Sequence, residues 1–505
     1  MTDTIIVGAG FAGVGMGICL RRQGERSFVI LERGGDVGGT WRDNIYPGVA
    51  CDIPSHLYSY SFRPNANWSK FYADGSEILG YLRQAVQEEG LLPHLRLHEE
   101  ATSMRWDGES RRWTVRTPQG VYVSRVLIVA AGRLSEPRYL DVPGLRSFAG
   151  PVFHSSRWRP DIDLAGQRVG IVGTGASAVQ LLPKVAEQGA DVVLFQRSPA
   201  YIVPRANRTY SQSERRKLSL IPGALARLRA RLFWKAEMGF AERIGVPTFV
   251  DALQERALGH LEAQVSDPNL RAQLTPDYAI GCKRILLSDD FYPALCGENV
   301  RLEPSAVSRA EGNRIHSASG TGYDLDMLIL ATGFKSTRPP FASRIVGAGG
   351  VVLSERWEHG MVAYASTMVA GFPNLFIMDG PNASLGHNSA IHMIETQIEF
   401  ILGALNYLQS SESDVLDVSR AAEDSYTADI DKRSASTVWL TGGCSSWYVD
   451  AGSRRLTLLW PDLASSFRHE VGTFDPESYM AQPTGPVEPW VLDAAAGLAS
   501  EVRAR

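Results

Sequence analysis

Residues 4–13 read TIIVGAGFAG, and the fold class can be inferred from them. A short β-branched run leads directly into a G-x-G-x-x-G sequence, and residues with helical spacing follow it. In such a turn Gly8 permits the tight bend, Gly10 lets backbone approach a pyrophosphate, and Gly13 lets the helix pack close to the strand. The stretch therefore predicts the start of a dinucleotide-binding βαβ unit, whose helix N-terminus faces the phosphates.

An acidic residue at the end of the next strand indicates which nucleotide this unit binds. Residues 28–31 form a second apolar run that leads to Glu32, 24 positions after Gly8. A carboxylate at this distance accepts hydrogen bonds from a ribose and repels a ribose 2′-phosphate. The first unit therefore suits the adenosine half of FAD or NAD rather than NADP. A glycine-rich turn without a ligand is the alternative, but the strand, the glycines, the helix and the acid all agree with a nucleotide site.

Residues 168–178, RVGIVGTGASA, repeat the pattern. Gly173 and Gly175 are followed by Ser177 and then by Ala178, which is an accepted replacement for the third glycine. We predict a second strand, phosphate loop and helix here, with the helix running to about residue 187.

The second unit differs from the first in the residue that meets the ribose. Its next strand, residues 191–195, leads to Arg197 and Ser198, and Arg197 lies 24 positions after Gly173. Arginine suits a 2′-phosphate because it forms charge-assisted and potentially bidentate hydrogen bonds. The pair of sites therefore predicts FAD in the first and NADPH in the second, with electron transfer between them. The plainer alternative is that Arg197 is a solvated surface charge.

The two units predict an α/β fold with two Rossmann-like domains, the NADPH domain being inserted into the FAD domain. Apolar runs that end in small residues, at 126–132 and 327–334, would carry the chain between the domains. The expected segments are the first FAD segment (1–147), the NADPH domain with a helical insertion at about 205–275 (148–324), and the second FAD segment with C-terminal substrate and cofactor loops (325–505).

Composition excludes several other classes of protein. With 505 residues, 44% of them hydrophobic, the chain is too apolar to be disordered. A net charge of −4 argues against nucleic acid as a partner. No apolar run is long enough for a membrane-spanning helix, and the first strand begins too early to leave room for a signal peptide. Five cysteines in a chain of this length do not make a disulfide framework. We therefore expect a cytoplasmic protein in a reducing compartment.

Two further patterns bear on partners and metals. Residues 211–240 combine basic residues with leucines near one helical face, which is compatible with a membrane surface but more typical of a solvated face over an apolar seam. His387 and His392 are five positions apart and do not share a helical face, so no metal site is predicted. We expect a monomer or homodimer that binds small molecules.

Further segments resemble the type I Baeyer–Villiger monooxygenases, which are class B flavoprotein monooxygenases that use FAD and NADPH. Residues 38–52, GGTWRDNIYPGVACD, match the family pattern G-G-x-W-x-x-x-x-Y-P-G-x-x-x-D, and residues 148–158, FAGPVFHSSRW, match its F-x-G-x-x-x-H-x-x-x-W fingerprint. Arg159 stands where the family usually has proline or aspartate. Residues 281–284, GCKR, resemble the family's Lys-Arg segment, and the similarity extends to about residue 478.

The resemblance implies that NADPH reduces FAD, that O₂ then forms a C4a-peroxyflavin, and that one oxygen atom is inserted beside a ketone to give an ester or lactone. Negative charge develops on the adduct in a dry site, where a fixed cation stabilises it. We predict that Arg284, which is always protonated, supplies this cation. Asp52 is predicted to orient the guanidinium and offset its desolvation. The plainer alternatives are a surface cation at 284 and a turn cap at 52.

The predicted cofactor contacts come from both units and from the matching segments. Those expected for FAD are Gly8, Gly10, Gly13, Glu32, Gly39, Thr40, Trp41 and Asp52. Those expected for NADPH are Gly173, Gly175, Ser177, Ala178, Arg197, Ser198, Lys283 and Trp447. The two tryptophans are equally well explained as core residues. Structural or conformational roles are expected for Phe148, Gly150, His154 and Trp158, with His154 a hinge or core residue rather than an acid–base catalyst.

Other activities remain open on the sequence. The same peroxyflavin could oxygenate nitrogen or sulfur, a reaction that needs no stabilising cation. An uncoupled NADPH oxidase and a non-catalytic nucleotide-binding sensor are further alternatives. The pyridine-nucleotide disulfide reductases need a redox cysteine pair, and the chain contains no C-x-x-C or C-x-x-x-x-C sequence.

Overall fold

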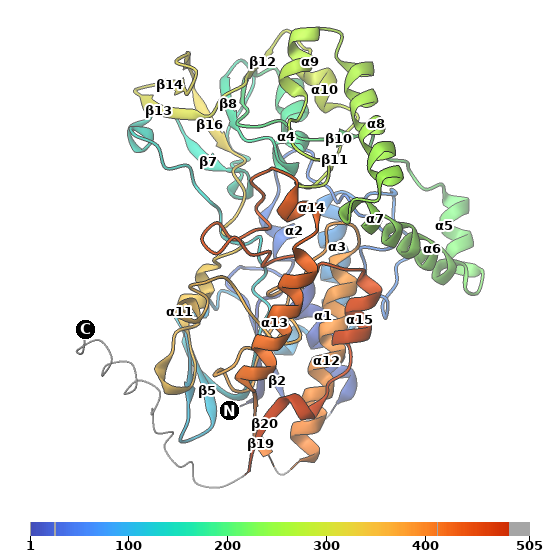
Figure 1. Ribbon diagram of the computed structural model, residues 1–505, viewed down its shortest axis with the longest axis vertical. Coiled ribbons are helices and arrows are strands. Elements are labelled where there is room, and N and C mark those ends of the chain that lie inside the picture. Colours follow the sequence, from blue (N-terminus) through green and yellow to red (C-terminus); the bar gives the residue numbers. More distant parts are fainter. Residues whose placement is uncertain (1, 25–26, 412, 484–505) are drawn as a thin grey trace.

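The computed structural model describes residues 2–24, 27–411 and 413–483. The described chain forms two α/β bodies, which lie one above the other in Figure 1, and each is built around a sheet with helices packed against it. Residues 484–505 of the predicted second FAD segment lie outside the described residues.

The lower sheet has the strand order β17-β4-β5-β6-β1-β2-β3, with β18 also paired to β6. β1 runs parallel to both neighbours, with Ile5 opposite Val29 and Leu127. Ile5 and Ile6 are fully buried because helices or strands cover both faces of this central strand. The strand bounds are β1 Thr2–Val7, β2 Phe28–Leu31, β3 Leu95–Arg96, β4 Ser103–Asp107, β5 Arg112–Thr117, β6 Gly120–Val129, β17 Ile345–Val346 and β18 Leu375–Ile377.

The helix that follows β1, α1 (Phe11–Gln23), is apolar around most of its circumference. It packs against α12 (Ala390–Ser410), so it is enclosed by protein. Glycines allow this close packing: a Cβ on Gly13 would lie 1.8 Å from the Gly8 carbonyl oxygen, and one on Gly15 would lie 3.1 Å from Ile398. The other helices of the lower body are α2 Thr40–Asp43, α3 Gly75–Glu88, α11 Leu353–Arg356, α13 Arg420–Ser434, α14 Val438–Thr441 and α15 Ala464–Val471.

The upper sheet has the order β12-β9-β8-β16-β7, and all of its pairings are parallel. Its strands fall between β6 and β17 of the lower sheet, so one α/β unit is inserted into another. The predicted fold class, two Rossmann-like units with the second inserted into the first, is confirmed. The bounds are β7 Val152–His154, β8 Arg168–Val172, β9 Asp191–Phe195, β12 Val300–Glu303 and β16 Met327–Leu330, with α4 Ala176–Glu187 and α10 Phe291–Leu295.

The run 327–330 is a strand of the upper sheet, and the chain passes to the lower sheet after it. As β16 it pairs with both β7 and β8, and Leu328, Ile329 and Leu330 are fully buried. A continuous apolar run of this kind is stable inside a parallel sheet. The upper sheet therefore ends at Leu330, after the predicted boundary at residue 324.

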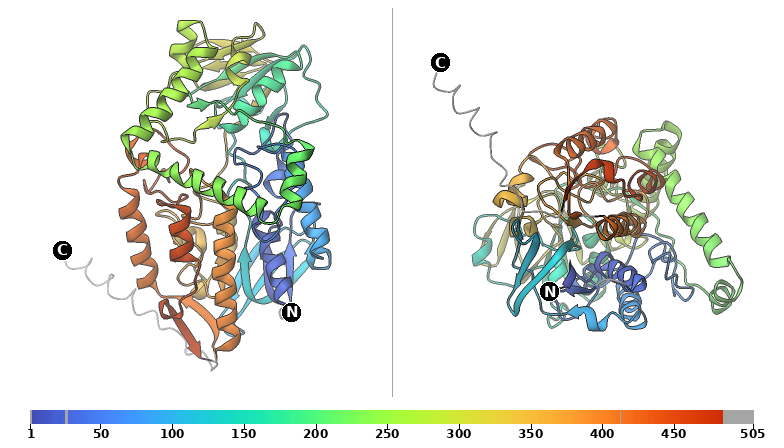
Figure 2. Two further views of the ribbon diagram at one scale, coloured as in Figure 1. Left: turned by 90° about the vertical axis from the view of Figure 1, so that its right-hand side faces the viewer. Right: turned by 90° about the horizontal axis from the view of Figure 1, so that it is seen from below.

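The helical insertion expected from the sequence is present as α5 to α9, and the α5–α6 pair extends to one side of the molecule (Figure 2). On α6, Leu232 is buried, and the Arg229 guanidinium turns inward to donate to the hydroxyl and carbonyl oxygens of Ser59 at 2.9 and 3.1 Å. Trp234 and Met238 remain exposed. Among the described helices, none combines the length and apolar character needed to cross a bilayer. The bounds are α5 Gln212–Leu220, α6 Ala224–Met238, α7 Phe240–Arg243, α8 Pro247–Gln264 and α9 Pro268–Leu274.

Short strands complete the described structure. β13, β14 and β15 form an antiparallel sheet on the upper body, β10 pairs with β11, and β19 pairs with β20. Their bounds are β10 Ile202–Val203, β11 Leu286–Leu287, β13 Val307–Glu311, β14 Arg314–Ser317, β15 Gly322–Asp324, β19 Ser413–Val418 and β20 Tyr479–Pro483.

Candidate active site

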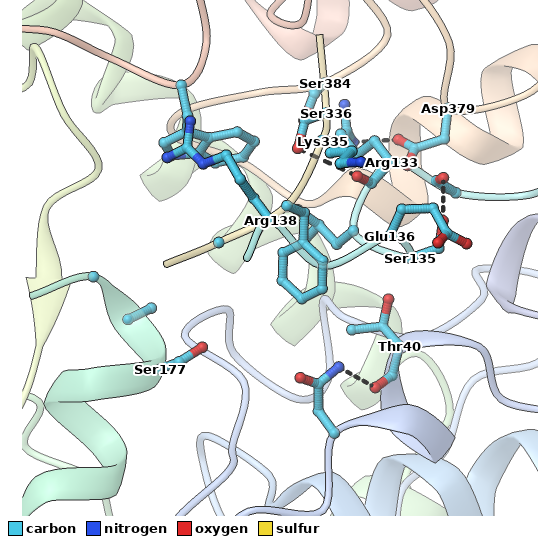
Figure 3. Close-up of a pocket in the computed structure, with 18 of the residues that line it drawn as sticks. Thr40, Arg133, Ser135, Glu136, Arg138, Ser177, Lys335, Ser336, Asp379 and Ser384 are labelled. Carbon is cyan, nitrogen blue, oxygen red and sulfur yellow. Dashed lines mark hydrogen bonds and ion pairs between the residues drawn. The ribbon is translucent and has the colours of Figure 1, made fainter. Parts of the chain in front are cut away.

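A cavity of about 1620 Å³ lies between the two bodies, and both glycine loops line it. Pockets for one small ligand usually measure about 300–1,000 Å³. The volume therefore exceeds what one small molecule needs. In Figure 3, Thr40 from the lower body and Ser177 from the upper body face the same space from opposite sides.

The first glycine loop connects β1 to α1 at the edge of the cavity. Gly8 has a φ of +106°, and a Cβ there would lie 2.4 Å from the Ala130 carbonyl oxygen, so the bend and the close contact require glycine. Gly10 has no such constraint, since the nearest atom to an added Cβ is the Gly39 Cα at 3.8 Å. Gly8 and Gly10 line the cavity. Gly13 lies behind the loop, where it serves packing.

Hydrogen bonds to Glu32 connect this loop to the segment that begins at Gly38. The Glu32 carboxylate accepts hydrogen bonds from the Ala9 and Gly34 amides at 2.9 and 2.7 Å and from the Arg42 guanidinium at 2.6 Å. The side chain of Glu32 is buried but lines the cavity, where a ribose diol would compete for its oxygens. The residues of this loop therefore fit an adenosine without a 2′-phosphate.

Gly39, Thr40 and Trp41 also line the cavity. Gly39 has a φ of +51° and precedes α2. Trp41 is 9% exposed, and its ring packs edge-on against Tyr58 at a centroid distance of 5.6 Å. The tryptophan is therefore a core residue that also forms part of the cavity wall.

The second glycine loop has the same construction. Gly173 has a φ of +115°, and a Cβ there would lie 2.5 Å from the Ala331 carbonyl oxygen. An added Cβ on Gly175 would meet no atom within 4 Å. Gly173, Gly175 and Ser177 line the cavity, whereas Ala178 is fully buried against the upper sheet. Ala178 therefore serves helix packing rather than ligand contact.

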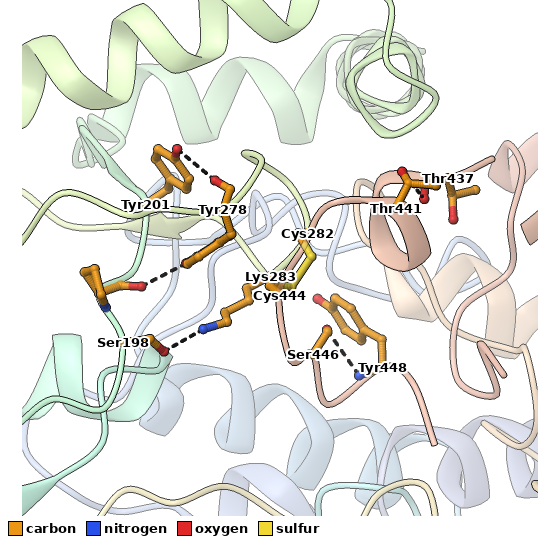
Figure 4. The surroundings of a disulfide bond; sticks show 11 residues. Ser198, Tyr201, Tyr278, Cys282, Lys283, Thr437, Thr441, Cys444, Ser446 and Tyr448 are labelled. Carbon is orange, nitrogen blue, oxygen red and sulfur yellow. Dashed lines mark hydrogen bonds between the residues drawn. A yellow bond between two sulfur atoms is a disulfide. The ribbon is translucent and has the colours of Figure 1, made fainter. Parts of the chain in front are cut away.

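Two cationic side chains and a serine hydroxyl lie close together beyond this loop, where the sequence predicts the 2′-phosphate. Lys283 donates a hydrogen bond to the Ser198 hydroxyl at 2.6 Å (Figure 4). Burial lowers the pKa of Lys283, and the nearby Arg197 charge lowers it further. All three residues line the cavity. An anion bound between Arg197 and Lys283 would relieve their repulsion.

Arg284 and Asp52 form an ion pair that bridges the two bodies. The Arg284 Nε donates to a carboxylate oxygen of Asp52 at 2.7 Å. The side chains are 28% and 26% exposed, because both line the cavity. The carboxylate raises the pKa of Arg284. Burial by itself would raise the pKa of Asp52, but the adjacent guanidinium outweighs it and holds this pKa below its ordinary value. The pair is therefore fully charged at neutral pH.

The fingerprint residues lie away from the cavity, at the base of the upper sheet. Phe148 is buried, and a Cβ on Gly150 would lie 2.0 Å from the Asp326 carbonyl oxygen. His154 is fully buried with its Nδ1 2.9 Å from the Ser156 hydroxyl, and burial lowers its pKa to about 4. Trp158 packs edge-on against Phe153. These contacts support structural roles.

Arg159, which departs from the family pattern, pairs with Asp161 at 2.6 Å. Both side chains are more than half exposed. The substitution therefore sits on the surface rather than at the cavity.

Sequence reasoning missed an ion pair in the cavity wall. Arg133 and Asp379 interact beside the first glycine loop, and both line the cavity (Figure 3). Asp379 closely follows β18, and an acid placed just after a buried strand is the pattern that could have identified it. Burial raises the pKa of Asp379 even though Arg133 opposes this shift.

The cysteines also depart from expectation. Cys282 and Cys444, expected to be unpaired, form a disulfide beside Lys283 (Figure 4). The two cysteines are 162 positions apart, so no local spacing could predict the pair. Cys19, Cys51 and Cys296 are free.

Trp447 follows Cys444 in a C-terminal loop that lines the cavity, and its side chain is 39% exposed. Trp447 is therefore a wall residue rather than a core tryptophan. Within the described residues, no group of three or more histidine, cysteine or acidic side chains is arranged to hold a metal ion.

Comparison with known proteins places the chain in a family. A family model described as pyridine nucleotide-disulphide oxidoreductase matches residues 5–217. A Baeyer–Villiger monooxygenase of Streptomyces coelicolor is 43% identical over 96% of this chain and 93% of its own length. One of Pseudomonas aeruginosa is 38% identical over 94% and 90%. A solved structure described as OTEMO complex with FAD and NADP has a TM-score of 0.85 and 26% identity, over 95% of this chain and 99% of its own. The chain therefore belongs to the Baeyer–Villiger monooxygenases.

Proposed function

We propose that this chain uses NADPH and O₂ to insert one oxygen atom next to a ketone carbonyl, giving an ester or lactone, with Arg284 as the stabilising cation. The observation that carries the proposal is the Arg284–Asp52 ion pair, which lies in a cavity shared by two dinucleotide loops. Family membership supports the reaction class, and the contrast between Glu32 and Arg197 supports the choice of cofactors.

The two loops hold the two cofactors in this proposal. Gly8, Gly10 and Glu32 receive the adenosine half of FAD, and the segment from Gly39 to Trp41 lies along the same ligand. When bound, FAD would supply the redox chemistry that links NADPH to dioxygen. The NADPH side is held by residues of the second loop and its neighbours, namely Gly173, Gly175, Ser177, Arg197, Ser198, Lys283 and Trp447.

Arg284 acts on the substrate. Its guanidinium would donate hydrogen bonds to the ketone oxygen as negative charge develops there. Asp52 is a positioning residue: it fixes the orientation of the guanidinium and offsets the cost of burying its charge. The pair needs no proton transfer, so its charges are constant across neutral pH.

The same cavity would also support oxygenation of a nitrogen or sulfur atom. That reaction passes through no tetrahedral oxyanion, so Arg284 would be dispensable. The presence of a charged arginine in the cavity favours the ketone reaction as the principal activity.

The test compares Arg284→Ala with wild type on a cyclic ketone and on a sulfide, with NADPH-dependent oxygen uptake and product mass as readouts. Ester formation is expected to fall by about 100-fold or more, since loss of one such donor costs roughly 10²–10³ in rate. Sulfoxide formation and FAD content should change little. Arg159→Ala, a surface arginine, is the control. Ester formation at the wild-type rate in Arg284→Ala would contradict the proposal.

We further propose that the FAD domain comprises residues 1–147 and the chain that follows β16, and that the NADPH domain runs from residue 148 to the end of β16 at Leu330 rather than to residue 324. The strand pairing of β16 supports this placement of the second boundary. Under this division the described α5–α9 helices belong to the NADPH domain, although Arg229 contacts the FAD domain.

A further inference from the structure

The disulfide between Cys282 and Cys444 joins two walls of the cavity (Figure 4). Cys282 directly precedes Lys283 and Arg284. Cys444 lies in the loop of residues 442–450, which we name the Trp447 loop. One backbone hydrogen bond also joins the walls, from the Ala279 amide to the Gly442 carbonyl oxygen at 3.0 Å.

The disulfide is one of the contacts that position the Trp447 loop, whose Tyr448 is also buried and packs against Trp439. α14 precedes the loop, and Asp450 at its end is held by Arg338 at 3.0 Å. Between these points, the hydrogen bonds found for residues 443–447 in the described structure stay inside the loop. The disulfide is therefore the covalent anchor that holds the middle of the loop against the Lys283–Arg284 segment.

The surroundings of the two sulfur atoms differ in access. Cys282 is fully buried, whereas Cys444 is half-buried and lines the cavity. A Cβ on Gly442 would lie 2.8 Å from the Cys282 Cβ and 3.0 Å from its sulfur, so glycine at 442 makes room for the cross-link. A small thiol or peroxide can reach the pair from the Cys444 side, and the pair is shielded on the other side.

We propose that the Cys282–Cys444 pair is a redox site that positions the Trp447 loop over the NADPH-binding cations. This inference rests on the proposed function, because it assigns the cation cluster to NADPH. Closure is a two-electron oxidation by hydrogen peroxide. A Cys444 thiolate attacks one peroxide oxygen to give a sulfenic acid and hydroxide, which takes up a proton from solvent to become water. The Cys282 sulfur then attacks the sulfenic acid sulfur, and the disulfide forms with release of a second water that carries the Cys282 thiol proton. Opening is thiol–disulfide exchange with a dithiol.

The closed and open states differ in how the cavity holds NADP(H). With the disulfide closed, the Trp447 loop stays against Lys283 and the nucleotide enters a preformed wall. With the disulfide open, the loop must be ordered when the nucleotide binds, and this ordering weakens binding. Opening is therefore expected to raise the dissociation constant of NADP⁺ and the fraction of NADPH that ends as hydrogen peroxide.

The test uses the FAD-loaded full-length protein before and after treatment with dithiothreitol and desalting. Alkylation with iodoacetamide followed by peptide mass spectrometry should give a cross-linked 282–444 peptide before treatment and two alkylated peptides after it. The dissociation constant of NADP⁺, measured by calorimetry, should rise about tenfold on reduction. Added hydrogen peroxide should restore both the cross-link and the original value.

Variants separate positioning from general damage. Cys444→Ser and the Cys282→Ser/Cys444→Ser double variant should match reduced wild type and should no longer respond to dithiothreitol. Cys296→Ser, which removes an exposed free thiol, should behave as wild type. Because Cys444 is half-buried, its serine variant keeps the test available if the buried Cys282 variant fails to fold.

The outcomes are decisive for the redox site and distinct from those of the ketone reaction. Two thiols that are freely alkylated in wild type even after peroxide treatment would overturn the proposal. So would a cross-linked protein whose affinity for NADP⁺ is unchanged by reduction. Neither measurement uses a ketone. The absence of ester product would therefore contradict the proposed function without affecting the test of the redox site.

Discussion

The glycines of the two nucleotide loops divide into those that the fold requires and those that a ligand requires. Gly8 and Gly173 have positive φ angles and lie against carbonyl oxygens of neighbouring strands, so any side chain there strains the backbone. Gly10 and Gly175 have neither constraint, and the space around their Cβ positions is open. At these two positions a methyl group would occupy only the space where phosphates are expected.

This difference yields a paired prediction. Gly10→Ala should fold normally but bind FAD about tenfold or more weakly, because overpacking costs roughly 1–3 kcal/mol. Gly175→Ala should retain FAD and raise the KM for NADPH by a similar factor. FAD content by absorbance, steady-state kinetics and the Tm of each variant check both expectations.

The matched control is Gly259→Ala, at an exposed position of α8 where an added Cβ meets no atom within 4 Å. This variant should change neither cofactor. If Gly10→Ala instead raised the KM for NADPH with full FAD content, the assignment of the two loops would be reversed.

At the scale of elements, a buried carboxylate on the helical insertion joins it to the lower body, in addition to the Arg229–Ser59 contact. Glu237 on α6 accepts hydrogen bonds from the Ala464 and Ser465 amides at 3.1 and 3.0 Å and from Asn388 at 2.7 Å. The first two amides open α15, whose own N-cap residue makes no side-chain hydrogen bond. Glu237 therefore caps a helix of the other segment, and it also holds Asn388, which lines the cavity.

Glu237 makes stability depend on acidity in a defined range. Burial alone would raise its pKa, but the hydrogen bonds from His387, Ser465 and Asn388 outweigh burial and lower it from 4.5 to about 2. Because the pKa is depressed in the folded state, this contribution is present above pH 4.5 and is lost as the pH falls toward 2. We expect Glu237→Gln to reduce the free energy of unfolding at pH 7 by roughly 1–3 kcal/mol.

The measurement is urea unfolding of wild type and Glu237→Gln between pH 7 and pH 3. The difference between the two proteins should shrink as the pH falls below about 4.5, since the carboxylate of the unfolded wild type then takes up a proton while that of the folded protein stays ionised until the pH nears 2. Glu255→Gln, at an exposed position of α8, serves as the control. A difference that stayed constant with pH would show that the charge of Glu237 is not what anchors the helix.

At the scale of the whole molecule, the two bodies repeat one βαβ unit with opposite charges at equivalent positions. Glu32 follows β2 in the lower body, and Arg197 follows β9 in the upper body. The bodies meet through the Arg284–Asp52 pair and through Gln180, whose side chain accepts from the Tyr46 hydroxyl and donates to the Ala50 carbonyl, each at 3.0 Å. Residues 46–52 are therefore a part of the lower body that contacts the upper body next to the second glycine loop.

The charge contrast predicts the nucleotide preference of the whole enzyme. Arg197→Ala should lower kcat/KM for NADPH by about tenfold to a hundredfold, because a charge-assisted hydrogen bond contributes roughly 1.5–3 kcal/mol. The value for NADH and the FAD content should change little. Arg309→Ala, an exposed arginine of β13, is the control. Equal losses with NADPH and NADH would mean that Arg197 does not contact the 2′-phosphate.

Features that depend on short stretches of chain can be predicted from the sequence. The bends at Gly8 and Gly173, the close helix packing at Gly13, and the acidic or basic residue 24 positions on all follow from backbone sterics and local hydrogen bonding. These patterns, with the three family segments, are enough to predict the α/β fold, the inserted unit and the reaction class. Composition was a less reliable guide to the disulfide. The small number of cysteines argued against disulfides, and local spacing could not reveal a pair of cysteines far apart in the sequence.

Contacts between side chains far apart in the sequence follow from the tertiary structure alone. Arg284 and Asp52 are 232 positions apart, and Arg133 and Asp379 are 246 positions apart. Cys282 and Cys444 pair across 162 positions. Their meeting depends on how the two bodies dock and on how the loops between them close. The tertiary structure also places β16 in the upper sheet. An apolar run forms a strand where neighbouring strands have unpaired backbone groups for it to bond with. Local patterns carry no information about such docking, since its free energy comes from surfaces that form only when both bodies are folded.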